Sequence, residues 1–355
     1  MRVTDLGVLG TVLLLVSGCG GSPTPVLGCE AGADITPDCR FQNPEDLAPI
    51  ANGFLVSQMA KADRAGSIVY YNVGNAEIFT LFPSSAVRPE GTSWGDPACT
   101  HPDETKFAPH GIDLDRRADG TLTLYVVNHG GRESIEMFDV SEGDGVVTTR
   151  WHGCVVGPEG ANFNDVVGLS DGGFWTTQMF SEAGTWALLK GIVFHAKSGW
   201  VYAWHPADGW SKLPGTDSAF PNGIEKAPDE SAVYVNSYFA GTITKFDAAT
   251  GENLGAANVE TPDNVTWSSD GRLLVASHTD SYQEIMACGS LTEGSCGYAF
   301  EIVAVDPATM QTLPVLAHRG APMGGATVAA ERDGWLYLGT FAGDRISRWK
   351  WRPDE

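Results

Sequence analysis

Segments in which apolar and polar residues alternate recur along this chain, each followed by a tight turn and a second segment of the same kind. The stretch from residue 110 to residue 129 shows the unit well. An alternating segment leads through Asp119-Gly120 to a second one rich in β-branched and aromatic residues. A period of two, with Asp and Gly in the turns, is typical of antiparallel strands with one buried face. Similar units open near residues 45, 110, 164, 222, 263 and 325, so the pattern predicts six modules.

Repeated small β-sheet units predict an all-β fold, and six of them predict a six-bladed β-propeller. The last module shows three strands instead of four. We therefore expect the segment before Glu45 to supply the missing strand and to close the ring. Residues 90–108 and 279–298 interrupt the pattern and are predicted to be loops, which often shape specificity on a rigid scaffold.

Five of the six modules open with polar side chains. These openings are Glu45-Asp46, His110-Gly111, Asn164-Asp165, Asn222-Gly223 and Asp263-Asn264, whereas the sixth is Gly324-Gly325-Ala326-Thr327. A single Asn or Asp at a strand start is usually a turn residue. In a propeller, however, the innermost strands begin near one central channel, so five such positions favour a shared ligand cage. Carboxylate and amide oxygens suit a hard cation such as calcium.

Two histidines lie where adjacent strands of the second module meet. His110 opens the first strand and His129 ends the second, so antiparallel pairing brings them together at one face. A histidine pair beside a cation can act as a general base on water. His278 ends a strand of the fifth module at the same face and is a weaker candidate, for substrate binding.

The motif GxSxG occurs twice, around Ser93 and around Ser170. A nucleophile elbow requires a strand before the serine and a helix after it. The first match lies in a predicted loop and the second in a strand–turn–strand unit, so neither serine is predicted to be catalytic.

The N-terminus has the pattern of an export signal. Leu6 to Val16 is apolar but too short to span a bilayer as a mature helix. It leads into Val16-Ser17-Gly18-Cys19, which looks like a bacterial lipobox. We expect a signal peptide at residues 1–18, lipidation of Cys19, a flexible tether to residue 28 and a propeller at 29–355. The residue after Cys19 is Gly, which favours the outer membrane; a secreted or periplasmic protein is the alternative.

Composition limits the partners and the redox setting. A net charge of −22 argues against nucleic acid as a partner. An even number of further cysteines in an exported chain predicts disulfides, and without a CxxC pair a thiolate zinc site is not expected. Many pairings are possible; short loops favour Cys29–Cys39 and Cys288–Cys296, which leaves Cys99–Cys154.

Several short stretches, in this order, resemble the paraoxonases, a family of arylesterases and lactonases. They include Pro109-His-Gly-Ile, Leu124-Tyr-Val-Val-Asn-His-Gly, Asn162-Phe-Asn-Asp-Val-Val, Phe220-Pro-Asn-Gly-Ile, Pro262-Asp-Asn-Val and Gly325-Ala-Thr-Val-Ala. The resemblance runs from residue 45 to about residue 350. Broader relatives are the regucalcin-like gluconolactonases and the strictosidine-synthase-like proteins.

The resemblance implies a six-bladed propeller with two calcium ions in its channel. By this resemblance, the catalytic calcium is held by Glu45, Asn164, Asn222, Asp263 and Asn264. The structural calcium is held by Asp46, Asp165 and the backbone carbonyl of Ile112, and His110 with His129 matches the family's histidine dyad.

The expected function is calcium-dependent hydrolysis of lactones or aryl esters. Alternatives are a non-catalytic, calcium-stabilised binding lipoprotein and a gluconolactonase-like sugar lactonase. One departure concerns the disulfide with which the family ties its first strand to its last. The last strand here reads Trp349-Lys-Trp351, without a cysteine, so Cys39 must pair elsewhere. The loop that holds Cys288 and Cys296 looks like an insertion.

Overall fold

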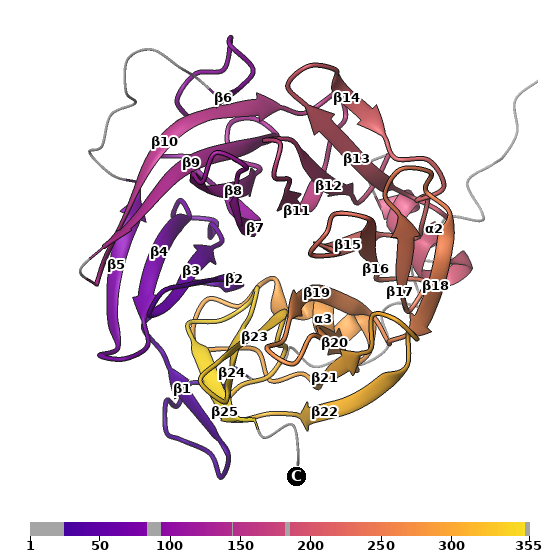
Figure 1. The fold of residues 1–355 in the computed structure, drawn as a ribbon. Helices are drawn as coiled ribbons and strands as arrows, with labels where there is room; N and C mark the ends of the chain where they lie inside the picture. The colour runs from indigo at the N-terminus through magenta and orange to yellow at the C-terminus, as the bar shows by residue number, and fades with distance from the viewer. Residues whose placement is uncertain (1–24, 84–93, 144, 182–184, 352–355) are drawn as a thin grey trace, which may run out of the picture.

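Six small β-sheets surround a central channel, and the chain is a six-bladed β-propeller, as the sequence predicts (Figure 1). The structure is a computed structural model that describes residues 25–83, 94–143, 145–181 and 185–351. In blades 1 to 5 the main four strands follow one another outward from the channel in chain order and pair antiparallel. In blade 2 a short strand that precedes the other four in the chain, β6 (Trp94–Gly95), adds to the outer edge and runs parallel to its neighbour.

The strand bounds follow the predicted modules. Blades 1 and 2 contain β2 (Pro44–Ile50), β3 (Gly53–Gln58), β4 (Ser67–Asn72), β5 (Glu77–Phe82), β7 (Pro109–Arg116), β8 (Leu122–Asn128), β9 (Ser134–Gly143), β10 (Val146–Val156) and the short β6 (Trp94–Gly95). Blades 3 and 4 contain β11 (Phe163–Gly168), β12 (Phe174–Gln178), β13 (Trp200–His205), β14 (Gly209–Lys212), β15 (Pro221–Lys226), β16 (Ala232–Ser237), β17 (Thr242–Asp247) and β18 (Asn253–Asn258). Blades 5 and 6 contain β19 (Pro262–Trp267), β20 (Leu273–His278), β21 (Phe300–Val305), β22 (Thr312–His318), β23 (Val328–Arg332), β24 (Trp335–Gly339) and β25 (Ile346–Lys350).

An N-terminal strand closes the ring, which confirms the prediction. Strand β1 (Ile35–Asp38) pairs antiparallel with β25 and completes the fourth position of blade 6. Arg345, which is fully buried, holds the segment before β1 by donating hydrogen bonds to the carbonyl oxygens of Val26 and Gly28. Val26 and Gly28, at the end of the predicted tether, therefore contact the residue that precedes the last strand of blade 6.

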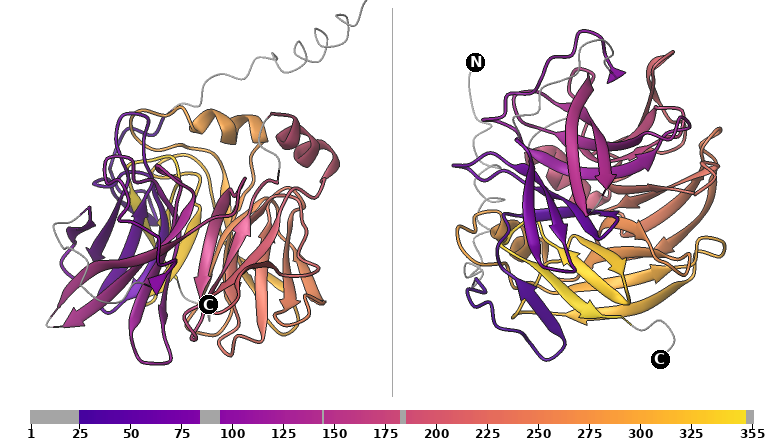
Figure 2. Two further views of the ribbon diagram at one scale, coloured as in Figure 1. Left: turned by 90° about the horizontal axis from the view of Figure 1, so that it is seen from above. Right: turned by 60° about the vertical axis from the view of Figure 1, so that its left-hand side comes forward.

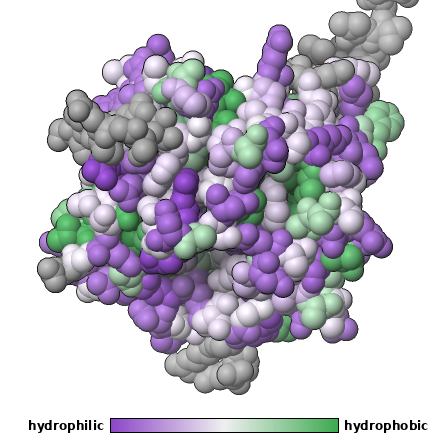
Figure 3. Space-filling view, turned by 45° about the horizontal axis from the view of Figure 1, so that its top comes forward, coloured by the Kyte–Doolittle hydropathy of each residue, from purple (hydrophilic) through white to green (hydrophobic). Residues whose placement is uncertain are grey.

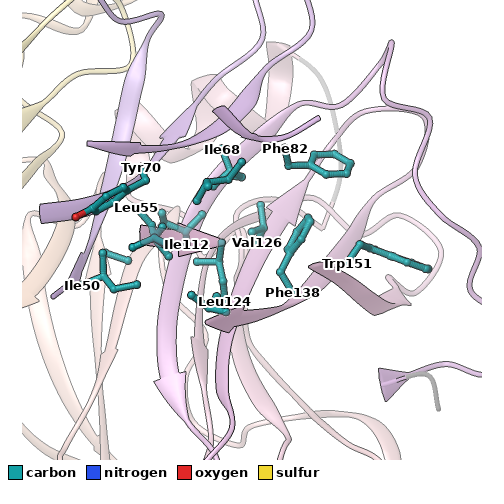
Figure 4. Close-up of a cluster of buried hydrophobic side chains, with 14 of the residues drawn as sticks. Ile50, Leu55, Ile68, Tyr70, Phe82, Ile112, Leu124, Val126, Phe138 and Trp151 are labelled. Carbon is teal, nitrogen blue, oxygen red and sulfur yellow. The ribbon is translucent and has the colours of Figure 1, made fainter. Parts of the chain in front are cut away.

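Apolar side chains fill the spaces between adjacent blades. The cluster between blades 1 and 2 is an example (Figure 4). Its members include Ile50, Leu55, Ile68, Tyr70, Phe82, Ile112, Leu124, Val126, Phe138 and Trp151. Because every blade buries both of its faces against neighbours, the inner strands are held rigidly around the channel.

Two helices lie on one face of the ring (Figure 2). Helix α2 (Thr185–Phe194) follows β12, and helix α3 (Tyr282–Cys288) follows β20. The prediction of a loop at residues 279–298 was wrong for α3, which begins with a capping box between Ser281 and Glu284. In the predicted loop at 90–108, β6 forms a two-residue strand. No helix within the described ranges is long and apolar enough to cross a membrane.

Three disulfides form with the pairing that the short loops favour: Cys29–Cys39, Cys99–Cys154 and Cys288–Cys296. Cys39 thus pairs within the N-terminal segment. On the face shown in Figure 3 hydrophilic residues predominate and hydrophobic ones are scattered in small groups, in keeping with the high net charge. The predicted signal peptide, Cys19 and Ser93 lie outside the described residues.

Candidate active site

The polar openings of blades 1 to 5 lie at irregularities in their inner strands. The pairing register shifts between Pro44 and Asp46, Pro109 and Ile112, Phe163 and Val166, Pro221 and Ile224, and Pro262 and Val265. A β-bulge takes residues out of the ladder and re-aims their side chains. The inner strand of blade 6, β23, pairs without a shift and opens with small residues. The bulges therefore explain how consecutive residues such as Asn164 and Asp165 can both direct their side chains toward the channel.

Two glycines allow the inner strands to approach one another closely. A Cβ on Gly111 would lie 2.6 Å from the Cα of Asp165, and a Cβ on Gly223 would lie 2.7 Å from the Cα of Asn264. Real Cβ atoms do not approach other atoms so closely. The glycines after His110 and Asn222 are thus required by the packing of one blade's opening against the next.

Five buried side chains form what we call the upper ring: Glu45, Asn164, Asn222, Asp263 and Asn264. The nitrogens of its three amides are turned toward neighbours. Asn264 donates to Oε1 of Glu45 at 2.7 Å, Asn164 lies 3.5 Å from the sulfur of Met179, and Asn222 bonds to Asp263. The oxygens of the three amides therefore point away from these neighbours.

Four acceptor oxygens of the upper ring are buried without a hydrogen-bond partner among the described residues. They are Oε2 of Glu45 and Oδ1 of Asn164, Asn222 and Asn264. An unpartnered buried polar atom costs about 1–3 kcal/mol, so four in one place require a common explanation. A bound divalent cation would be one such explanation, because two ionised carboxylates would supply a charge of −2 and calcium accepts amide oxygens as ligands.

Histidine is not needed for such a site, and cysteine is absent from it. Within the part of the chain that the structure describes, no group of three or more His, Cys, Asp or Glu side chains is placed to hold a metal. The upper ring has two carboxylates and three amides, so its donor set resembles an oxygen-rich calcium site and not a zinc site.

Burial opposes the ionisation of the upper-ring carboxyls. It raises the pKa of Glu45 well above its usual range, with further contributions from the charges of Asp46 and Asp263. Burial likewise raises the pKa of Asp263 to about 8, although a hydrogen bond from Asn222 opposes the rise. Both carboxyls therefore favour the proton or another cation over bare negative charge.

Two further aspartates, Asp46 and Asp165, form what we call the lower pair. Each carboxylate oxygen accepts one backbone N–H, and the donors are Leu47 and Ile112 for Asp46 and Val166 and Ile224 for Asp165. Each aspartate thus joins its own blade to the next one. Burial raises the pKa of Asp46 to about 6 and that of Asp165 well above its usual range, the latter also because of the charge of Asp46. The ligand roles of the lower pair and of the Ile112 carbonyl stay predictions.

The two histidines meet as the sequence predicts. Nδ1 of His110 lies 2.9 Å from Nε2 of His129, and Nε2 of His110 lies 3.8 Å from Oε1 of Glu45. On its far side, Nδ1 of His129 lies 2.9 Å and 3.1 Å from the two carboxylate oxygens of Glu133. Burial and the neighbouring His129 lower the pKa of His110 to about 3, so His110 is neutral at neutral pH. The sequence pattern did not single out Glu133.

A cavity of about 220 Å³ lies above the upper ring. Its floor is polar, with Glu45, Asn164, Asn222, Asp263 and His110. Its walls are mainly apolar and aromatic, and α2 and α3 contribute to them: Met59, Met179, Ile192, Phe220, Tyr238, Phe239, Tyr282, Ile285, Met286 and Phe341. The cavity thus has polar groups at its floor and mainly apolar walls.

His278 also lines the cavity but is held on both nitrogens. Tyr238 lies 2.7 Å from its Nδ1, Tyr298 lies 3.0 Å from its Nε2, and Asp263 lies 3.3 Å from the same nitrogen. Burial lowers its pKa to about 3. These contacts place His278 against a member of the upper ring, and its predicted role in substrate binding stays a prediction.

Ser170 lies in the exposed turn between β11 and β12. Its backbone N–H and its hydroxyl donate to the carboxylate of Glu230 at 2.8 and 3.1 Å. Strand β12 follows it directly and not a helix, so this GxSxG match is a turn, as the sequence predicts.

Comparison with known proteins supports one family. A model of the arylesterase family matches residues 98–345. The chain is 26% identical over 251 residues to human serum paraoxonase/arylesterase 2 and 25% identical over 247 residues to the dog protein of the same name; these alignments cover 67% and 66%, respectively, of both chains.

Solved structures share the fold at low identity. A gluconolactonase from Xanthomonas campestris superposes with a TM-score of 0.52 at 18% identity, covering 92% of this chain and 94% of that one. A luciferin-regenerating enzyme superposes with a TM-score of 0.51 at 13% identity, covering 92% and 95%. With the family match over most of the propeller, the chain belongs to the arylesterase family, whose membership suggests hydrolysis of esters or lactones.

Proposed function

We propose that this protein is a calcium-dependent hydrolase of lactones and aryl esters. The observation that carries the proposal is the set of four unpartnered acceptor oxygens in the upper ring, three of which belong to residues at the floor of an apolar cavity, next to a histidine pair. The residues that would hold the ion are those of the upper ring. When bound there, calcium would supply Lewis-acid polarisation of the ester carbonyl and positive charge for the oxyanion that forms on attack.

His110 is the proposed general base. Its ring lines the cavity, with Nε2 on the side of Glu45. Because burial lowers the pKa of His110 to about 3, its role as base requires that His129 share the proton it accepts from the attacking water. The apolar walls bind the non-reacting part of the substrate and keep bulk water away from the polar floor. A carboxylate of the upper ring is the alternative base, since Glu45 lies 3.8 Å from His110.

The cavity walls favour apolar substrates over sugar lactones. Met, Phe, Ile and Tyr side chains line them, whereas recognition of a sugar requires hydrogen-bonding groups for its hydroxyls. The likeness to a gluconolactonase shows the fold alone. We therefore propose lactones with alkyl substituents and aryl esters as the substrate class.

Turnover of a lactone panel and phenyl acetate, with calcium and after chelation, tests this proposal. The protein should lack the predicted signal peptide but keep the residues from Pro25 onward, because Arg345 binds Val26 and Gly28. Calcium-dependent hydrolysis is the expected result. Absence of turnover with calcium still raising the Tm would instead favour the non-catalytic binding propeller.

His110→Gln tests the choice of base. Glutamine preserves much of the volume but does not accept a proton, so we expect kcat to fall by ~10²-fold or more. Calcium affinity should be retained, because His110 lies outside the upper ring. An unchanged kcat would transfer the role of base to a carboxylate such as Glu45.

A further inference from the structure

We infer that Glu133 is a positioning residue that sets the direction of proton movement through His129 and His110. This inference rests on the proposed function, since it concerns the base in that reaction. The two histidines and Glu133 form one line of contacts from the cavity outward, with 2.9 Å between the imidazoles and 2.9 Å from His129 to the carboxylate. Blade 2 supplies all three residues, two of them from the turn between β8 and β9.

The carboxylate fixes the tautomer of His129. An ionised carboxylate only accepts hydrogen bonds, so Nδ1 of His129 must carry the proton that it donates to Glu133. In the neutral ring Nε2 of His129 is then a bare acceptor. It faces Nδ1 of His110, which must therefore be the protonated nitrogen of that ring. The remaining nitrogen, Nε2 of His110, is left with its lone pair toward the cavity floor, as a base requires.

The same line gives the accepted proton a favourable destination. In the attack step a proton leaves water for Nε2 of His110, while the water oxygen forms its bond to the substrate carbonyl carbon. Transfer of the Nδ1 proton of His110 to Nε2 of His129 then moves the positive charge outward to the ring that contacts Glu133. The reverse transfers return one proton to the leaving oxygen as the ester bond breaks, so the net change is addition of one water.

The turn that holds Glu133 is itself firmly bound. The side chain of Asn128, which is fully buried, accepts hydrogen bonds from the N–H groups of Ala108 and Gly130. Oε1 of Glu133 accepts the N–H of Phe163 at 2.6 Å. Phe163 directly precedes Asn164 of the upper ring, so Glu133 connects the histidine pair to a strand that carries a proposed metal ligand. A carboxylate so held is suited to keep an imidazole in one orientation.

Glu133→Gln tests the inference without a large change of shape. The amide can donate to Nδ1 of His129 and so favour the opposite tautomer in both rings. We expect kcat to fall by ~10²-fold, as for loss of a properly oriented base, with KM changed less than about threefold. Glu133→Asp keeps an acceptor and should recover part of the lost kcat. Glu104→Gln is the matched control, because Glu104 pairs with His101 at 3.9 Å.

Nitrogen-15 NMR of the imidazole rings reports which nitrogen of His129 carries the proton. A merely structural role of Glu133 would not change that result. In the calcium-loaded wild type, we expect a protonated Nδ1 and a bare Nε2 in His129. A proton on Nε2 instead would overturn the inference, whether or not the variant folds. An unchanged kcat in Glu133→Gln would also overturn it. Failure of the wild type to hydrolyse any ester would overturn the proposed function separately, since the tautomer is measured independently of turnover.

Discussion

The upper ring and the lower pair use similar residues in opposite ways. In the lower pair every carboxylate oxygen accepts a backbone N–H, and the donors Ile112 and Ile224 belong to the next blade. In the upper ring, four acceptor oxygens have no partner among the described residues. Adjacent positions in sequence, Glu45 with Asp46 and Asn164 with Asp165, thus divide between joining blades and facing the cavity.

This difference shows how a channel can be both a structural support and a reactive site. Groups that saturate their hydrogen bonds with backbone stabilise the ring without any ligand. Buried acceptor oxygens without a hydrogen-bond partner carry a desolvation cost, which a cation can offset when it binds. Substitutions in the upper ring should therefore act mainly on activity, and substitutions in the lower pair should act mainly on stability.

The largest effect is expected from Asp263→Ala in the upper ring. The substitution removes one of the two carboxylates that would neutralise a divalent ion, so kcat/KM should fall by ~10³-fold or more. Calorimetric titration should show weakened calcium binding. Full activity in this variant would refute the calcium mechanism.

The same substitution in the lower pair, Asp165→Ala, should act mainly on stability. It leaves the buried N–H groups of Val166 and Ile224 without their acceptor, at a cost of about 2–5 kcal/mol in the free energy of unfolding. Denaturant unfolding in excess chelator measures this loss of unfolding free energy separately from any effect of calcium binding. If instead the loss appeared only in the presence of calcium, the lower pair would be a metal site first and a blade junction second.

Removal of calcium should make stability depend on pH in a defined direction. In the ion-free protein the pKa of Asp46 is raised to about 6 and that of Asp263 to about 8. Since these values exceed the unfolded value of about 3.9, the groups stabilise the fold fully below about pH 4, and the contribution is lost as pH rises toward 8. The Tm in chelator should therefore fall between about pH 4 and about pH 8. With saturating calcium this fall should be smaller, and an equal fall in both conditions would argue that the cation does not contact these carboxyls.

The smallest effect concerns blade 6, which contributes no upper-ring residue. The hydroxyl of Thr327 donates to the backbone carbonyl of Glu45 at 2.6 Å. Thr327→Val keeps the shape and removes this bond, so we expect a loss of about 1 kcal/mol in unfolding free energy. kcat and calcium affinity should remain close to wild type; a large change in either would mean that blade 6 also positions Glu45 for the ion.

Much of the fold could be predicted because its signals are local. Alternation and turn residues gave the six modules, and the missing strand of blade 6 pointed to the segment that forms β1. The capping box of Ser281 and Glu284 was a readable signal for α3, but the interruption of strand alternation hid it. Helix α2, which is apolar over most of its length, has no comparable start signal.

The site was predictable in its membership but not in its geometry. The polar openings identified the residues that gather at the channel, because blades repeat. The bulges that split Glu45 from Asp46, and the turn that brings Glu133 to His129, depend on contacts between segments remote in sequence. Glu133 occupies a position four residues after His129, yet nothing in that spacing outside a helix indicates a contact.

The closure of the ring by β1 has a consequence for how the chain folds. Strands β1 and β25 lie roughly 300 residues apart, and bringing such distant segments together costs on the order of 5 kcal/mol of chain entropy. Blades 1 to 5 pair strands close in sequence and can form as the chain emerges, whereas blade 6 waits for both ends. We expect its junction to form last, and hydrogen exchange should find the β1–β25 amides opening before those around the channel.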